Sequence, residues 1–265
     1  MSARYSFEGA SSSYDESRQV PAGVLAELGR LVAAQAAGGR WLDLGAGTGR
    51  ASRAAVSAGL RVVGIDVAPA MLTVLRQLEP SRRIDLVRGD FERLPFRDGT
   101  FAGALAYHVL HLTSDPAALL GHVHRALVPG GPILWLTDVP GGPGLYGRLK
   151  GRYAELVAGR CAFGKPASTD AAFVADAVAA LGGAVVELDA PLLSWDKEVL
   201  VTELLELFRT KAFSVLFPVP DEIHRDVMRQ LAPWAFRELP PSETMPFRIR
   251  ACRIDLPARR EGPAS

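Results

Sequence analysis

The feature that most constrains this chain is a short apolar segment that runs into three alternating glycines, Arg40-Trp41-Leu42-Asp43-Leu44-Gly45-Ala46-Gly47-Thr48-Gly49-Arg50. This pattern predicts a buried parallel strand that turns sharply into the N-terminus of a helix. Glycine adopts positive φ without steric cost, and its missing Cβ lets a ligand lie directly against the backbone. The segment therefore predicts a loop that binds a nucleoside.

The residues around the glycines indicate which kind of nucleoside the loop would bind. The dinucleotide fingerprint needs Gly or Ala where this chain has Arg50, because the helix packs closely on the strand at that point. Asp43 precedes the loop, and its carboxylate suits a cationic or amine-bearing ligand and would repel a pyrophosphate. The segment resembles the first motif of class I S-adenosylmethionine (SAM)-dependent methyltransferases. This resemblance implies SAM as the cofactor and S-adenosyl-L-homocysteine as its product.

Two acidic residues follow at the ends of the next predicted strands. Asp66 ends the strand 61–66, roughly 20 residues beyond the glycine loop, where a carboxylate accepts hydrogen bonds from both ribose hydroxyls. The alternative for Asp66 is an N-cap of the helix that Ala68-Pro69 opens. Asp90 stands at the carboxyl end of the strand predicted over residues 84–91, at the edge of the sheet where open α/β folds bind ligands.

Two further segments extend the resemblance. Residues 94–101 are similar to the connector that leads into the fourth strand of these methyltransferases, and residues 125–131 are similar to their Arg-x-Leu-x-Pro-Gly-Gly turn. In such enzymes Asp90 would accept from the adenine amino group, and the backbone amide of Phe91 would meet a ring nitrogen. The full set of cofactor-binding residues that the resemblance implies is Tyr14, Asp43, Gly45, Ala46, Gly47, Asp66, Val67, Met71, Asp90, Phe91 and Tyr107.

Two members of this set have open alternatives. Tyr14 lies in a Ser-rich N-terminal arm, which would either cover the methionine end of the cofactor or be a disordered tail. Met71 lies on the apolar face of a predicted helix, and that spacing favours a position in the core over a contact with the adenine.

The predicted fold is a Rossmann-like, doubly wound α/β domain over residues 1–265, with a mostly parallel seven-stranded sheet and flanking helices. Its parts are an N-terminal arm and helix (1–36), a SAM-binding core (37–138) and a helical lid inserted before the last strand (191–244). The insertion shows helical patterns over 198–208 and 221–234. Because it is rich in aromatic residues, it needs a surface to bury against, either as a lid over the substrate pocket or as a dimer interface.

The amino-acid composition limits the classes of partner that this protein can be expected to bind. Lys plus Arg number 30 and Asp plus Glu 29, a balance that gives no electrostatic reason to expect nucleic acid or an anionic membrane. No apolar run approaches the ~20 residues of a membrane span, and the N-terminus lacks the apolar core of a signal peptide. We therefore expect a cytoplasmic monomer or homodimer without membrane insertion. Cys161 and Cys252 show no metal spacing and are expected to be reduced thiols, and no metal site is predicted.

Histidine is the side chain best suited to proton transfer at neutral pH, and four of the five histidines lie between residues 108 and 124. His108 immediately follows the fourth strand and is the first candidate for a base or for a group that orients the methyl acceptor. His111 is the second, with a simple loop hydrogen bond as its alternative. His122 and His124 are two residues apart on a predicted helix, so they point to different sides and cannot share a metal ion.

The sequence also excludes some methyl acceptors. No Asn/Asp-Pro-Pro-aromatic motif follows the fourth strand, which counts against methylation of adenine or glutamine amino groups. The chain has no Pro-Cys pair, which counts against pyrimidine methylation through a covalent cysteine intermediate. A small-molecule acceptor methylated on O, N or C remains, as in the quinone-biosynthesis-like branch that the sequence most resembles. The alternatives are a dinucleotide-binding Rossmann oxidoreductase, a non-catalytic SAM-binding module and an enzyme acting on RNA.

Overall fold

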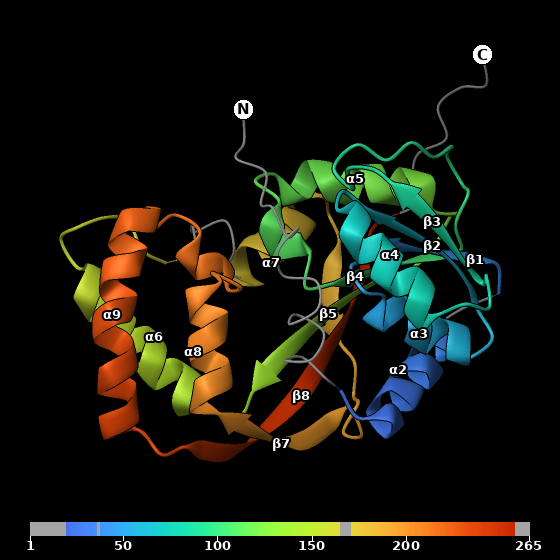
Figure 1. The fold of residues 1–265 in the computed structure, drawn as a ribbon. Coiled ribbons are helices and arrows are strands. Elements are labelled where there is room, and N and C mark those ends of the chain that lie inside the picture. The colour runs from blue at the N-terminus through green and yellow to red at the C-terminus, as the bar shows by residue number, and fades with distance from the viewer. Residues whose placement is uncertain (1–19, 36–37, 165–170, 258–265) are drawn as a thin grey trace. The chain divides into compact units, whose positions relative to one another are not determined.

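The computed structural model describes residues 20–35, 38–164 and 171–257, and these form two compact units (Figure 1). Among the described residues, the larger unit holds 20–138, 171–193 and 249–257, and the smaller holds 139–164 and 194–248. In the described part of the chain, no helix is both long and apolar enough to cross a membrane.

The larger unit is built on five parallel strands, in the spatial order β3-β2-β1-β4-β5. These are β1 (Arg40–Leu44), β2 (Arg61–Asp66), β3 (Ile84–Arg88), β4 (Gly103–Tyr107) and β5 (Ile133–Pro140). The chain runs outward from β1 through β2 to β3 and then crosses to β4 on the other side of β1. The carboxyl ends of β1 and β4 therefore lie at the topological switch point, where open α/β sheets bind their ligands.

Helices flank these strands, as the resemblance predicted. They are α2 (Ala22–Ala34), α3 (Arg50–Ser57), α4 (Pro69–Leu78), α5 (Pro116–Ala126) and α7 (Ala171–Ala180). Helices α2 and α3 pack closely, since a Cβ added to Gly29 would lie 2.3 Å from the carbonyl oxygen of Ala54. Asp115 caps α5 by accepting a hydrogen bond from the amide of Ala118.

The sheet has eight strands, one more than the predicted seven. Strand β8 (Ser242–Asp255) is antiparallel to both of its short partners, β6 (Ala184–Glu187) and β7 (Ser194–Leu200). The prediction missed β7 because three consecutive charged residues, Asp196-Lys197-Glu198, lie in its middle and its last residues were assigned to a helix. That helix, α8 (Val201–Arg209), begins only where the pairing with β8 ends.

The smaller unit has a hydrophobic core of its own. Helices α6 (Gly144–Val157), α8 and α9 (Asp221–Glu238) bury their apolar faces against one another, with Tyr153 and Phe208 fully buried. The aromatic residues of the insertion thus find much of their burial within this unit, although Phe236 remains 61% exposed. Helix α9 continues past Pro233 and ends four residues beyond the predicted boundary. The lid function of residues 191–244 stays a prediction.

Candidate functional site

The glycine loop joins β1 to α3 in the predicted manner. Gly45, Gly47 and Gly49 all have positive φ, at 59°, 55° and 84°. A Cβ added to Gly49 would lie 2.0 Å from the side chain of Leu75, so a larger residue here would force Leu75 of α4 to shift. At Gly47 an added Cβ would meet only the Gly45 carbonyl oxygen, at 3.9 Å. The described side chains therefore leave the backbone of Gly47 open to a ligand.

Asp43, on the strand that precedes the glycine loop, holds the helix that follows the loop. It is buried, and its Oδ2 accepts hydrogen bonds from the amide (3.1 Å) and hydroxyl (2.5 Å) of Ser52, in the first turn of α3. Burial raises the pKa of Asp43 to about 7, against the lowering effect of the two Ser52 hydrogen bonds. The carboxylate thus fixes the helix to the end of β1, and its predicted contact with the cofactor stays a prediction.

Asp66 connects the end of β2 to the loop. Its Oδ2 accepts from the amide of Gly47 and its Oδ1 from the amide of Ala68, both at 2.8 Å. The second bond closes a turn before α4, whose N-cap residue is Ala68, so the N-cap alternative for Asp66 is wrong, while the first bond holds the loop in place. Each carboxylate oxygen accepts more than one hydrogen bond, so both roles leave acceptor capacity for ribose hydroxyls. Burial raises the pKa of Asp66 above its ordinary value.

The remaining predicted nucleoside residues lie beside the loop or in the core. A Cβ on Gly45 would lie 3.8 Å from the ring of Phe91, which places this ring at the loop. Asp90 accepts from the amide of Glu92 at 3.0 Å, in a turn after β3. Met71 is buried on α4, in keeping with its core alternative, and Val67 is partly exposed. Tyr14 lies outside the described residues.

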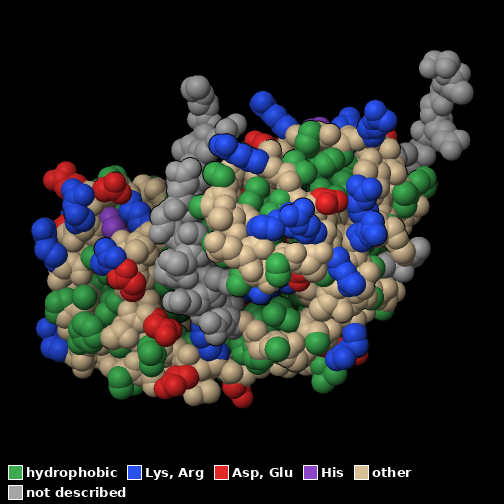
Figure 2. Space-filling model, turned by 45° about the vertical axis from the view of Figure 1, so that its right-hand side comes forward, with side chains coloured by type: hydrophobic (Ala, Val, Ile, Leu, Met, Phe, Trp, Pro, Cys, Tyr) green, Lys and Arg blue, Asp and Glu red, His purple; other side chains and the backbone are tan. Residues whose placement is uncertain are grey.

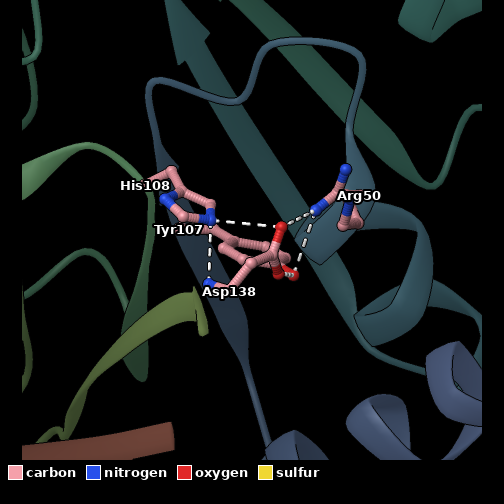
Figure 3. A network of polar contacts seen from close by, with 4 residues as sticks. All are labelled: Arg50, Tyr107, His108 and Asp138. Atoms are coloured by element: carbon pink, nitrogen blue, oxygen red, sulfur yellow. Dashed lines mark hydrogen bonds and ion pairs between the residues drawn. The ribbon is translucent and has the colours of Figure 1, made fainter. Parts of the chain in front are cut away.

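A polar network joins the ends of β4 and β5 to the start of α3 (Figure 3). Asp138 is at its centre: Oδ2 pairs with Nη1 of Arg50 at 2.7 Å, and Oδ1 accepts from the hydroxyl of Tyr107. Nη1 of Arg50 also donates to the Tyr107 hydroxyl oxygen at 3.2 Å. Nε2 of His108 lies 2.8 Å from the Asp138 backbone nitrogen and 3.2 Å from Oδ2.

The charges in this network are fixed. Burial alone would raise the pKa of Asp138, but its contacts with His108, Arg50 and Tyr107 hold that pKa below the ordinary range. Burial and the negative charge of Asp138 raise the pKa of the Tyr107 phenol. Asp138 is therefore ionised and Tyr107 neutral near pH 7, and the pair with Arg50 carries no net charge.

His108 has an unusual backbone conformation. Its φ is +53°, a left-handed value that is uncommon outside glycine and in which histidine is enriched. Its ring stacks on Tyr107 with the centroids 5.2 Å apart and meets the ring of His111 edge-on at 6.3 Å. Both candidate histidines thus lie together at the end of β4, as predicted. Such strained residues cluster at functional sites.

The predicted site residues are therefore brought to one edge of the sheet, apart from Tyr14 and the core residue Met71. The prediction missed Arg50 and Asp138 as parts of the site. Asp138 lies at the carboxyl end of a parallel strand, a position where ligands bind, and this signal was available in the sequence. In the sequence analysis, Arg50 was used only as evidence against a dinucleotide-binding loop.

Comparisons with known proteins agree with this geometry. A family profile described as "Methyltransferase domain" matches residues 42–135. A demethylmenaquinone methyltransferase of Clavibacter sepedonicus is 35% identical over 133 residues, which cover 48% of this chain and 54% of that protein. A malonyl-[acyl-carrier protein] O-methyltransferase of Serratia marcescens is 38% identical over 104 residues, covering 39% and 40%. This chain spans about half the length of the curated relatives it matches.

A solved structure extends the likeness in fold alone. The YcgJ protein of Bacillus subtilis superposes with a TM-score of 0.55 at 18% identity, over 89% of this chain and 99% of its own. The matched family implies SAM as the cofactor. Residues 42–135 match the profile of a methyltransferase domain, and over this part of the sequence the chain is similar to proteins named as methyltransferases.

Proposed function

We propose that this protein transfers the methyl group of SAM to a small-molecule acceptor. The observation that carries the proposal is the pairing of Gly47 with Asp66 at the switch point of the sheet. The open backbone of Gly47 and the carboxylate of Asp66 are joined by a hydrogen bond, so a nucleoside would meet both at once.

The residues present fit this cofactor. The loop residues Gly45, Ala46 and Gly47 would lie against its methionine portion, with Asp43 bracing the loop from behind. Asp66 would accept from the ribose hydroxyls, next to Val67. Asp90 and Phe91 would contact the adenine, and the remaining candidates are Tyr14, Met71 and Tyr107.

For methyl transfer, the main task of the protein would be to align the acceptor with the methyl group. Bound SAM supplies a methyl group already activated by its sulfonium. The residues at the ends of β4 and β5 would hold the acceptor in line with that group and exclude water, and alignment alone contributes about 7–11 kcal/mol in favourable intramolecular cases. We place His108 and His111 on this side, His108 as the base or the acceptor-orienting group.

The distribution of charged side chains supports a small molecule, and not a nucleic acid, as the methyl acceptor. The net charge is +1, and Figure 2 shows basic side chains dispersed among polar and hydrophobic ones on the face in view. Nucleic acid binding calls for a concentrated basic patch. The relatives named above are methyltransferases by name, one of demethylmenaquinone and one of malonyl-[acyl-carrier protein]. We propose a small O, N or C nucleophile as the acceptor and a cytoplasmic monomer or homodimer as the working form.

The direct test is transfer of label. Purified protein is incubated with methyl-labelled SAM and a panel of phenols, quinones, carboxylic acids and amines, and incorporation of the label into each compound is followed. Enzyme-dependent transfer to one chemical class supports the proposal. Binding of S-adenosyl-L-homocysteine without transfer to any acceptor would favour the non-catalytic module instead.

A further inference from the structure

The turn that follows β3 carries two of the candidate cofactor residues. Within the turn, the amide of Glu92 donates to Oδ1 of Asp90 at 3.0 Å, and the amide of Arg93 donates to the Asp90 carbonyl at 2.9 Å. A Cβ placed on Gly45 would lie 3.8 Å from the ring of Phe91, so the turn reaches the glycine loop. The geometry of this turn therefore sets where Asp90 and Phe91 lie relative to the loop.

Two contacts from outside the turn hold Glu92. Its Oε1 accepts from the hydroxyl of Thr113 at 2.6 Å, and its carbonyl oxygen accepts from Nδ1 of His122 at 3.1 Å. Thr113 follows the short 3₁₀ helix η1 (Leu110–Leu112), and His122 is on α5. With the bond from its amide to Asp90, Glu92 is held through its backbone N–H, its backbone carbonyl and its side chain.

The Thr113 hydroxyl is directed at Glu92 by the start of α5. Its oxygen accepts from the amide of Asp115 at 3.1 Å, so its hydrogen is left for the Glu92 carboxylate. Thr113 is only 2% exposed, and a hydroxyl buried in this way loses stability when its hydrogen has no acceptor. The contact between Thr113 and Glu92 is therefore a specific constraint on the turn.

We propose that Glu92, held by Thr113 and His122, is a positioning residue for the base of the cofactor, and that it makes the site select adenine over hypoxanthine. This inference rests on the proposed function, in which Asp90 and Phe91 contact the base, and it deepens that function. Glu92 does not touch the ligand in this account, because it acts through the turn.

The two bases differ in the groups that would face Asp90 and the amide of Phe91. Adenine presents an amino group, which donates, beside a ring nitrogen that accepts. Hypoxanthine presents a carbonyl oxygen, which accepts, beside a ring N–H that donates. A carboxylate and a backbone N–H held at fixed positions pair with adenine and oppose hypoxanthine. When the turn is loosened, the carboxylate turns toward water and the penalty against hypoxanthine falls.

The test compares S-adenosyl-L-homocysteine with its 6-oxo analogue, S-inosyl-L-homocysteine, by calorimetric titration of the full-length protein. We expect the wild type to bind the adenine compound about ten-fold or more tightly than the analogue. Thr113→Val removes the hydroxyl and should reduce this ratio of Kd values about three-fold or more, whereas Thr113→Ser keeps the hydroxyl and should retain the ratio. A purely structural role would raise both Kd values by the same factor, and an unchanged ratio in Thr113→Val would overturn the proposal.

Substitutions of Glu92 test the same contact from its other side and do not depend on the folding of Thr113→Val. Glu92→Gln keeps an oxygen that accepts from Thr113 and should retain the ratio. Glu92→Met has a similar length without that oxygen and should reduce the ratio as Thr113→Val does. Equal ratios in these two Glu92 variants would contradict the proposal.

His122 and His124 give a matched pair on α5. His122→Ala removes the donor to the Glu92 carbonyl and should reduce the ratio, whereas His124→Ala should leave it unchanged. Asp115→Ala removes the side-chain cap of α5, controls for a loss of helix stability and should also leave the ratio unchanged. A reduction in Asp115→Ala as large as in Thr113→Val would assign the effect to the stability of α5 and overturn the role of Glu92.

The same titrations separate a failure of this inference from a failure of the proposed function. A wild type that binds neither compound at millimolar concentration would contradict the cofactor site itself, and the inference with it. A wild type that binds both compounds with equal Kd values would keep the cofactor site and overturn the selection of adenine.

Discussion

Oδ2 of Asp66 lies 2.8 Å from the backbone nitrogen of Gly47, so the end of β2 and the glycine loop form one hydrogen-bonded unit. The carboxylate and the open backbone are therefore positioned together before any ligand arrives. This arrangement makes the loop's geometry, and not only its glycine content, a determinant of cofactor binding.

A methyl group at Gly47 should weaken cofactor binding. In Gly47→Ala the added Cβ meets nearly open space, but it occupies the surface against which the ligand would lie, at a φ of +55°. We expect at least a ten-fold rise in the Kd for S-adenosyl-L-homocysteine. Gly59→Ala is the matched control, since Gly59 also has positive φ with no atom within 4 Å of an added Cβ. Equal Kd values in the two variants would show that the ligand does not lie on Gly47.

A methyl group at Gly49 should instead destabilise the fold. Its Cβ would lie 2.0 Å from Leu75, so Gly49→Ala adds a steric clash to the strain of positive φ, whereas Gly59→Ala adds strain alone. We expect Gly49→Ala to lower the free energy of unfolding by about 1–3 kcal/mol more than Gly59→Ala does. Urea denaturation followed by circular dichroism measures both, and equal losses would exclude the close packing of loop on α4.

Asp43 should make stability fall as pH rises. Burial raises its pKa from 3.8 to about 7, so between these values the folded state binds a proton that the unfolded state has released. Its stabilising contribution is full below pH 3.8 and is lost as pH rises through 7. Asp43→Asn keeps an oxygen for Ser52 and removes the titration.

The difference in unfolding free energy between wild type and Asp43→Asn isolates this effect. Wild type should lose stability relative to the variant between about pH 4 and pH 7. A difference that stays constant over this range would mean that the pKa of Asp43 is not raised.

His224, in the smaller unit, should make stability fall as pH decreases, which is the opposite of the effect expected for Asp43. Its Nδ1 accepts from the hydroxyl of Tyr153 at 2.7 Å and its Nε2 donates to the carbonyl of Arg209 at 3.2 Å. Burial lowers the pKa of His224 below 6.5, because a protonated ring would be a buried charge and could not accept from Tyr153. Stability from this group is present above pH 6.5 and is lost as pH falls below it.

Unfolding of wild type and His224→Gln at pH 7.5 and pH 5.5 measures this contribution. Wild type should lose more stability on acidification than the variant, whose amide does not titrate. The same loss in both proteins would place the acid sensitivity elsewhere.

Much of the larger unit could be predicted from the sequence because β1, β2 and β4 are mostly buried and read as largely apolar runs. Strands β1 and β2, with the glycines and Asp66 between and after them, are local patterns of this kind. Strand β7 was missed because its fold depends on pairing with β8, more than forty residues later, and its own residues alternate between exposed and half-buried. Local periodicity does not contain that information.

The polar network was missed for a similar reason. Arg50 and Asp138 are 88 residues apart, and no local pattern pairs them. Sequence reasoning placed His108 correctly at the end of a strand. It could not foresee that the imidazole would accept a backbone hydrogen bond from Asp138, because this follows from the left-handed turn of His108 and the register of β4 with β5.

Calorimetric titration with S-adenosyl-L-homocysteine tests most directly whether a SAM-type nucleoside binds at Asp66 and the glycine loop. We expect saturable binding to the wild type with a Kd in the micromolar range, about −8 kcal/mol at 1 μM. Asp66→Asn should raise that Kd at least ten-fold, and Asp85→Asn, an exposed change on the neighbouring strand β3, should leave it unchanged. Absence of binding at millimolar ligand, or equal Kd values for wild type and Asp66→Asn, would contradict the account.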